Sequence, residues 1–193
     1  LPASSAASDV YKRQAYMRLI LNCHDDVAFE RVVNIPPRGI GERTVDAVRE
    51  HARNISISMW SAAKAMIVDK NLNTRSANAL AAFLNLINEM TNTLEALPLS
   101  ELAENSIEMS GLIEMHRREK GERGQSRVEN LEELVGACKN FSPESIDTPV
   151  LAQFLDQVSL EAGERQANED QDAVQLMTLH SAKAVSYTHL TLP

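Results

Sequence analysis

The sequence has few cysteines, and they are not spaced to build a metal or disulfide framework. Its two cysteines, Cys23 and Cys138, lie far apart, and neither belongs to a Cys-x-x-Cys pair. This spacing gives no support to a zinc knuckle and little to a disulfide-stapled fold. We therefore expect two reduced thiols, in the core or at the surface.

Long apolar runs are also missing. No stretch approaches the roughly 18 to 20 consecutive apolar residues of a membrane-spanning helix, and the N-terminus lacks the basic-then-apolar order of a secretory signal. With 193 residues, of which 44% are hydrophobic, the chain can bury the core of one globular domain, or of one domain plus part of another. The sequence therefore predicts a soluble, cytoplasmic protein that does not interact with membranes.

Positive charge is scarce, since the sequence has 19 basic and 27 acidic residues and a net charge of −8. Nonspecific DNA affinity comes from neutralised phosphates, so this balance argues against a protein that coats nucleic acid by bulk charge. Residues 31–53 and 117–127 depart from it, with local net charges of +2 and +3. Solvated helix faces are the alternative explanation of both segments, and the one we favour for residues 117–127.

The two ends differ from the rest of the chain. Residues 1–14 and 184–193 show neither helical periodicity nor strand alternation that continues into their neighbours. Both resemble translated sequencing-adapter read-through, and natural flexible tails are the alternative. We predict that neither end has stable secondary structure, and without them the net charge is −9.

Most of the remaining chain has helical periodicity, with apolar residues recurring every three or four positions. Asp25 or Asp26 can cap one of these helices, and Gly111 and Gly121 are plausible breaks. The predicted helices cover residues 16–23, 27–33, 42–54, 58–68, 74–97, a segment that starts at Pro98, 126–141 and 149–163. The sequence therefore predicts a mainly α, bundle-like fold.

The periodicity changes only near the C-terminus. After an acidic linker over residues 163–172, the run AVQLMTLH over residues 173–180 alternates like a strand entering a sheet. One strand cannot form an independent sheet. This orphan strand therefore either pairs with something outside the chain or remains an unpaired edge.

The segment NIPPRGIGERTVDAV, residues 34–48, places two glycines around an isoleucine directly before a predicted helix. Glycine tolerates positive φ and lets another backbone approach closely, and the start of a helix exposes unpaired N–H groups. Gly39 and Gly41 can therefore leave open a set of backbone donors that suits phosphate, while Ile40 plugs into the core. The same arrangement is found in the helix-hairpin-helix motif, which binds the DNA backbone without reading the bases. The side chains that can assist are Arg38, Arg43 and Thr44.

Other chemistry has weaker support in the sequence. An ordinary turn between packed helices would also explain the Gly-Ile-Gly element. The element is not a dinucleotide-binding or P-loop motif, because no strand precedes it and Gly-Lys-Ser/Thr is absent. The histidines and paired carboxylates show no ligand or triad spacing, so we predict no catalytic residues and no metal site.

Three blocks of the sequence, in this order, resemble the middle of UvrD/Rep-type superfamily-1 DNA helicases. They are AYMRLILNCHDDVAFERVVNIPPRGIGERTVDAV, EKGERGQSRVENLEELV and DAVQLMTLHSAK, and the resemblance covers roughly residues 15–183. It implies the helical subdomain called 2B, inserted into the RecA-like α/β domain 2A. The implied organisation is an edge of 2A over residues 15–24, subdomain 2B over 25–162, a linker over 163–172, and a return to 2A over 173–183.

The resemblance also implies roles for particular residues. Gly39, Ile40 and Gly41, with Thr44 nearby, match the element at which 2B contacts duplex DNA. The return to 2A matches part of helicase motif V, represented here by Thr178, Leu179, His180, Ser181, Ala182 and Lys183. Where the family continues with Gly-Leu-Glu, this chain has Ala-Val-Ser, so the acidic nucleotide contact is missing.

The resemblance therefore implies part of a 3′-to-5′ ATP-dependent DNA helicase of DNA repair, without its ATPase motor. The parent helicase would use ATP and magnesium, act on duplex and single-stranded DNA, and meet repair proteins, whereas this chain is expected to bind no cofactor. A 2B subdomain that swivels between open and closed states is expected to tune unwinding. The alternative is a stand-alone helical protein-interaction domain, in which the arginines serve acidic partners.

Overall fold

The computed structural model describes residues 14–119 and 121–164, and within these ranges every regular element is a helix. The mainly α prediction is therefore confirmed. Predictions for residues 1–13 and 165–193, which include most of both tails, the linker, the orphan strand and motif V, lie outside the described residues. Gln14, the last residue assigned to the N-terminal tail, belongs to a helix over residues 14–21 and is 1% exposed.

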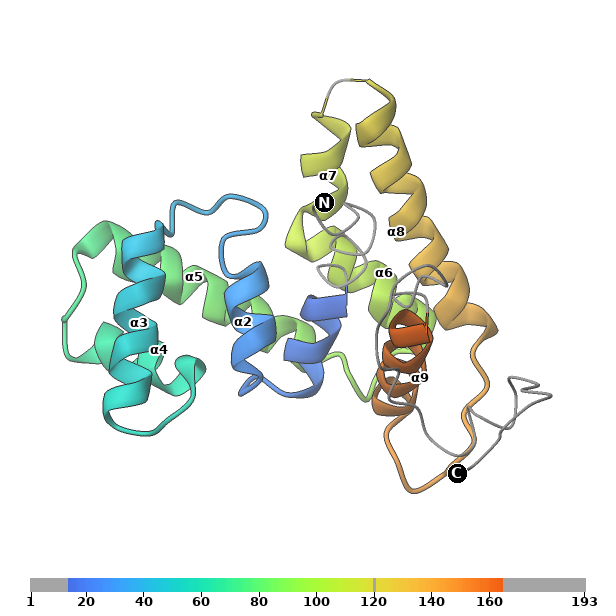
Figure 1. The fold of residues 1–193 in the computed structure, drawn as a ribbon, viewed down its shortest axis with the longest axis horizontal. Coiled ribbons are helices and arrows are strands. Elements are labelled where there is room, and N and C mark those ends of the chain that lie inside the picture. The colour runs from blue at the N-terminus through green and yellow to red at the C-terminus, as the bar shows by residue number, and fades with distance from the viewer. Residues whose placement is uncertain (1–13, 120, 165–193) are drawn as a thin grey trace, which may run out of the picture. The chain divides into compact units, whose positions relative to one another are not determined.

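The helices follow one another along the chain, with the longest connections over residues 33–41 and 141–149 (Figure 1). None of those within the described ranges is long and apolar enough to cross a bilayer. After the helix over residues 14–21 they are α2 (Asp26–Val32), α3 (Glu42–Asn54), α4 (Met59–Val68), α5 (Thr74–Thr91), α6 (Leu99–Ser110), α7 (Leu112–Arg117), α8 (Glu122–Asn140) and α9 (Val150–Glu164).

Side-chain caps fix where several helices begin. The Asp25 carboxylate accepts a hydrogen bond from the Ala28 N–H at 2.9 Å, and Ser58 and Asn73 cap α4 and α5 in the same way. Such caps satisfy N–H groups that have no partner inside the helix. The starts predicted for α2, α3, α4 and α5 agree with the structure to within a residue.

The predicted end of α5 was wrong. The periodic stripe suggested a helix to Leu97, but α5 ends at Thr91 and residues 92–97 form turns. The Thr93 hydroxyl donates to the carbonyl oxygen of Met90 at 2.7 Å, and the Thr93 N–H donates to the same oxygen at 3.1 Å, so the chain forms a tighter turn here. Threonine side chains compete with helical hydrogen bonding in this way, which an apolar periodicity does not reveal.

The core contains side chains from every helix between residues 14 and 157, which belong to one compact unit of the chain. The helix over residues 14–21 contributes fully to this core, because Tyr16 and Met17 are at most 1% exposed. Phe29 of α2 and Phe83 of α5 meet edge to face, with ring centres 5.5 Å apart. Cys23 and Cys138 are free thiols, as expected, and burial raises the pKa of Cys138 to about 12. The assignment of residues 15–24 to domain 2A stays a prediction, but here they pack as part of the helical unit.

Helices α7 and α8 form a closely packed hairpin (Figure 1). Gly124, in the first turn of α8, makes the close approach possible, because a Cβ added there would lie 2.5 Å from the Glu119 carbonyl oxygen and 2.6 Å from that of His116. Across the hairpin, Arg127 donates to both carboxylate oxygens of Glu119 at 2.7 and 2.6 Å. A hydrogen bond from His116, together with Arg127, lowers the pKa of Glu119.

Replacing Gly124 by alanine is expected to destabilise the chain by more than about 1 kcal/mol, because the new methyl group would press on backbone atoms that cannot move alone. The matched control is Gly136→Ala in the same helix, where an added Cβ meets nothing within 4 Å. Removing that glycine is expected to stabilise α8 by up to about 1 kcal/mol. Urea unfolding of both variants checks this, and equal stability of the two would contradict the packing argument.

Candidate nucleic-acid interface

The Gly-Ile-Gly element lies in the loop between α2 and α3, residues 33–41, and so completes a helix-loop-helix. Ile40 is 1% exposed and anchors the loop in the core, as predicted. Gly39 and Gly41 on either side of it are exposed. Ile40 therefore anchors the C-terminal end of the loop in the core, while the glycines on both sides of it stay exposed.

The two glycines have different conformations. Gly39 has φ of +79°, in the left-handed region that strongly favours glycine. Gly41 is the N-cap of α3, with φ of −74° and ψ of 161°, a conformation open to any residue. A Cβ added to either would meet nothing within 4 Å. The space in front of both glycines is therefore empty, but only Gly41 could carry a side chain without backbone strain.

The start of α3, next to these glycines, carries unpaired backbone donors. The N–H groups of Gly41, Glu42 and Arg43 have no hydrogen-bond partner among the described residues, whereas the Thr44 N–H donates to the Gly41 carbonyl oxygen at 2.9 Å. The first turn of a helix also carries the positive end of its dipole. Such a group of donors can bind an anion, in particular a phosphate.

Asn34 organises the inside of the loop. Its side-chain oxygen accepts hydrogen bonds from the Arg38 N–H at 2.7 Å and the Ile40 N–H at 3.3 Å. Our reading of the sequence missed this residue. The available signal was an asparagine directly before a proline-containing turn, where its side chain often bonds to the following backbone.

The guanidinium of Arg38 points into the chain. It donates to the carbonyl oxygens of Val32, Pro36 and Ser110 at 3.3, 2.9 and 3.0 Å, and to the Tyr16 hydroxyl at 2.6 Å. It also lies 5.6 Å from the ring centre of Phe83. Arg38 is thus part of the scaffold of the loop, although its sequence position had suggested a side chain that faces DNA.

The other predicted side chains lie at the start of α3. Arg43 is exposed and has no ion pair among the described residues. The Thr44 hydroxyl donates to the Ser76 hydroxyl at 3.2 Å and so ties α3 to α5. Glu42 is exposed beside the open N–H groups, where its charge would compete with an incoming anion. Arg43 is therefore the predicted basic side chain that is free to meet a ligand.

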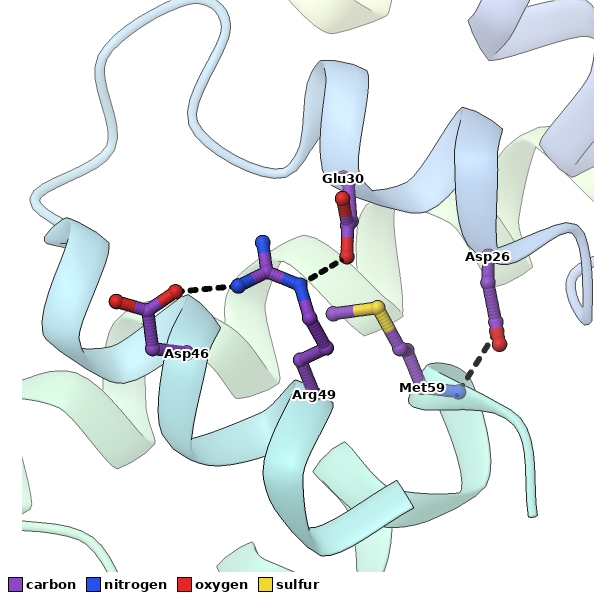
Figure 2. A network of polar contacts seen from close by, with 5 residues as sticks. All are labelled: Asp26, Glu30, Asp46, Arg49 and Met59. Atoms are coloured by element: carbon purple, nitrogen blue, oxygen red, sulfur yellow. Dashed lines mark hydrogen bonds and ion pairs between the residues drawn. The ribbon is translucent and has the colours of Figure 1, made fainter. Parts of the chain in front are cut away.

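A polar network holds the helices around this loop together (Figure 2). Arg49 of α3 bonds to Glu30 of α2 and to Asp46 one turn earlier in α3. Asp26 accepts from the Met59 N–H at 2.8 Å and so joins α2 to the start of α4. Because these groups bind one another, we assign a structural role to the shallow cleft that Asp26, Glu30, Arg49 and Met59 help to line.

Thr178, His180, Ser181 and Lys183, the partial motif V, lie outside the described residues. Within residues 14–119 and 121–164, no group of three or more His, Cys, Asp or Glu side chains is arranged to hold a metal ion.

The chain belongs to the UvrD-like helicases, because residues 9–192 match the UvrD-like helicase C-terminal domain. It is 49% identical over 175 residues to DNA helicase II of Escherichia coli (strain K12), which covers 90% of this chain and 24% of that protein. It is 34% identical over 179 residues to the ATP-dependent DNA helicase PcrA of Bacillus subtilis (strain 168), with the same coverage.

The chain thus spans about a quarter of the length of the curated relatives that it matches. The family resemblance read from the sequence is confirmed. The match reaches into residues 9–14 and 184–192, which we had interpreted as adapter read-through, and that interpretation of the two ends stays a prediction.

Alkaline pH is expected to weaken the loop scaffold through Tyr16. Burial raises the pKa of Tyr16 to about 12, and the neighbouring Arg38 offsets part of that rise. Because the folded-state pKa lies above the unfolded value, the stabilisation is complete below pH 10 and is lost as pH rises through 12. The loss amounts to about 2–3 kcal/mol.

Urea unfolding between pH 8 and pH 12 checks this expectation. The Tyr16→Phe variant should be less stable at pH 8 by roughly 1–2 kcal/mol, because the Ile35 carbonyl loses its donor. The variant should then lose less stability than the wild type on going to pH 12. Parallel curves for the two proteins would show that Tyr16 does not carry the effect.

Proposed function

We propose that this chain is the duplex-contacting 2B subdomain of a 3′-to-5′ ATP-dependent DNA helicase that acts in DNA repair. The observation that carries the proposal is the group of unpaired N–H groups at the start of α3, next to Gly39 and Gly41, where an added Cβ would meet nothing within 4 Å. Membership of the UvrD-like helicase family supports DNA as the ligand.

The geometry favours the phosphate backbone over the bases. Backbone N–H groups at a helix start bind phosphate oxygens without reading sequence. Arg43 adds a mobile positive charge next to them. The net charge of −8 opposes binding, so we expect the isolated chain to bind duplex DNA weakly, with a dissociation constant of roughly 10⁻⁴ to 10⁻⁶ M.

The other functions of the parent helicase belong to parts outside this chain. We propose that ATP and Mg²⁺ are bound elsewhere, because the sequence contains no Gly-Lys-Ser/Thr loop that could cradle the phosphates. In the same proposal residues 173–183 return to domain 2A with part of motif V, single-stranded DNA is held by the motor, and the helicase works in the bacterial cytoplasm. Repair proteins are its proposed partners.

Gly41 offers the sharpest test of the phosphate contact. Aspartate is a better helix N-cap than glycine, so Gly41→Asp should fold at least as stably as the wild type. Its negative charge would stand where the phosphate is expected and should weaken duplex binding by about fivefold or more. Fluorescence anisotropy with a labelled duplex, on the full 193-residue chain, measures the effect.

The matched control is Gly41→Asn, which has the same shape and no charge. It should bind duplex DNA more tightly than Gly41→Asp, although its side chain fills part of the same space. Gly136→Ala, a glycine replacement in α8, should bind like the wild type. Duplex affinity that is unchanged in Gly41→Asp, with folding preserved, would refute the phosphate contact.

Two neighbouring residues should change the affinity in opposite directions. Arg43→Gln should weaken binding and reduce the slope of log K against log salt by about 0.9, because one phosphate contact is lost. Glu42→Gln should strengthen binding, because it removes a negative charge beside the open N–H groups. A titration at several salt concentrations measures both, and a slope near zero for the wild type would favour a protein-interaction domain instead.

A further inference from the structure

The side chain of Arg38 has a role that its position in the sequence does not suggest. We propose that Arg38 is the positioning residue of the phosphate-binding loop, and that it holds Gly39–Gly41 in place by binding Tyr16 and the end of α6 without touching DNA itself. This inference rests on the proposed function, since it concerns the same loop.

The hydrogen-bond inventory of Arg38 supports the first part of the proposal. A guanidinium has five N–H donors, two on each terminal nitrogen and one on Nε. One terminal nitrogen donates to Val32 and Pro36, and the other donates to Tyr16 and Ser110. All four terminal donors are therefore used inside the chain. No terminal pair is left for the two-pronged contact by which arginine usually grips a phosphate.

The partners of Arg38 come from four parts of the chain. Tyr16 lies in the helix over residues 14–21, Val32 is the last residue of α2, Pro36 lies in the loop itself, and Ser110 is the last residue of α6. Gly111, which follows Ser110, also abuts the loop, because a Cβ added there would lie 3.8 Å from Cγ of Pro36. One side chain thus ties the loop to two helices that are distant in sequence.

This attachment matters because of the residue that follows. Gly39 is directly bonded to Arg38 in the chain, has a positive φ, and loses more conformational freedom on ordering than any other residue type would. Asn34 and Ile40 restrain the far side of the glycine, and Arg38 restrains the near side. The open N–H groups at Gly41 and beyond therefore owe part of their fixed position to Arg38.

Replacing Arg38 by lysine distinguishes a positioning role from a direct contact with DNA. Its single ammonium keeps the positive charge but cannot reproduce a planar fork that reaches four acceptors. If Arg38 contacted phosphate, Arg38→Lys would retain most of the binding, since lysine also binds phosphate as a point charge. If Arg38 positions the loop, Arg38→Lys should lose affinity although the charge is unchanged.

The experiment uses the full 193-residue chain and compares the wild type with Arg38→Lys, Arg38→Gln, Tyr16→Phe and the matched control Arg123→Lys, which changes an exposed arginine of α8. Three quantities are measured: duplex affinity at several salt concentrations, the folded fraction by urea unfolding, and the amide NMR signals of residues 39–41 without DNA. The amide signals report the loop itself and do not depend on DNA binding.

We expect Arg38→Lys and Tyr16→Phe each to weaken duplex binding by about three- to tenfold at equal folded fraction, with an unchanged salt slope because no phosphate contact is lost. Both should shift the amide signals of residues 39–41 in the free protein. Arg123→Lys should change the affinity by less than about twofold and leave these signals in place, because it keeps the charge and lies outside the loop. Tyr16→Phe removes only a buried hydroxyl, so it carries the test if Arg38→Lys does not fold.

Wild-type affinity and wild-type amide signals in Tyr16→Phe and in any folded Arg38→Lys would overturn the positioning role. A salt slope that falls by about 0.9 in an Arg38→Gln variant would also overturn it, because it would show a direct phosphate contact. The Gly41→Asp variant separates the two proposals. If it weakens binding while Arg38→Lys and Tyr16→Phe do not, the positioning role fails and the proposed function stands. If Gly41→Asp binds like the wild type, the proposed function itself fails.

Discussion

The loop between α2 and α3 depends on the planar guanidinium of Arg38 and the acceptors gathered around it. Four terminal N–H groups meet three backbone carbonyls and one buried tyrosine hydroxyl. Each acceptor would carry a desolvation cost without its donor, so removing the guanidinium would leave several partly buried groups unsatisfied at once. This makes the interaction a constraint on the backbone of the loop and on the helices next to it.

The same constraint explains how an exposed glycine-rich segment can be ordered enough to bind a ligand. Glycines leave room for a phosphate, but a flexible glycine segment would lose conformational entropy on binding, and that loss would weaken the affinity. Ile40 in the core, Asn34 beneath the backbone and Arg38 beside Gly39 remove that freedom in advance. The Glu30–Arg49–Asp46 network restrains the two helices that flank the loop, because it links α2 to α3 at their exposed sides.

The distribution of charge agrees with the proposed local contact between this loop and DNA. The chain is acidic overall, and several arginines of residues 31–53 are occupied inside the protein, Arg38 by the loop and Arg49 by two carboxylates. The local excess of basic residues counted in the sequence thus overstates the charge that is available to a ligand. What remains near the loop is Arg43, opposed by Glu42, together with uncharged backbone donors.

The sequence by itself determined the helical class, most helix starts, the burial of Ile40 and the family, because periodicity, caps and glycine spacing are local patterns that the chain shows in one dimension. Only the tertiary structure decided which way each polar side chain points. Arg38 and Arg43 are both arginines beside the same glycines, yet one is drawn inward by Tyr16 and Ser110, which are 22 and 72 residues away, and the other faces solvent. The end of α5 was misjudged because an apolar stripe continues through turns that threonine hydroxyls stabilise. Partners that distant become neighbours only when the helices pack, so no local pattern could have revealed them.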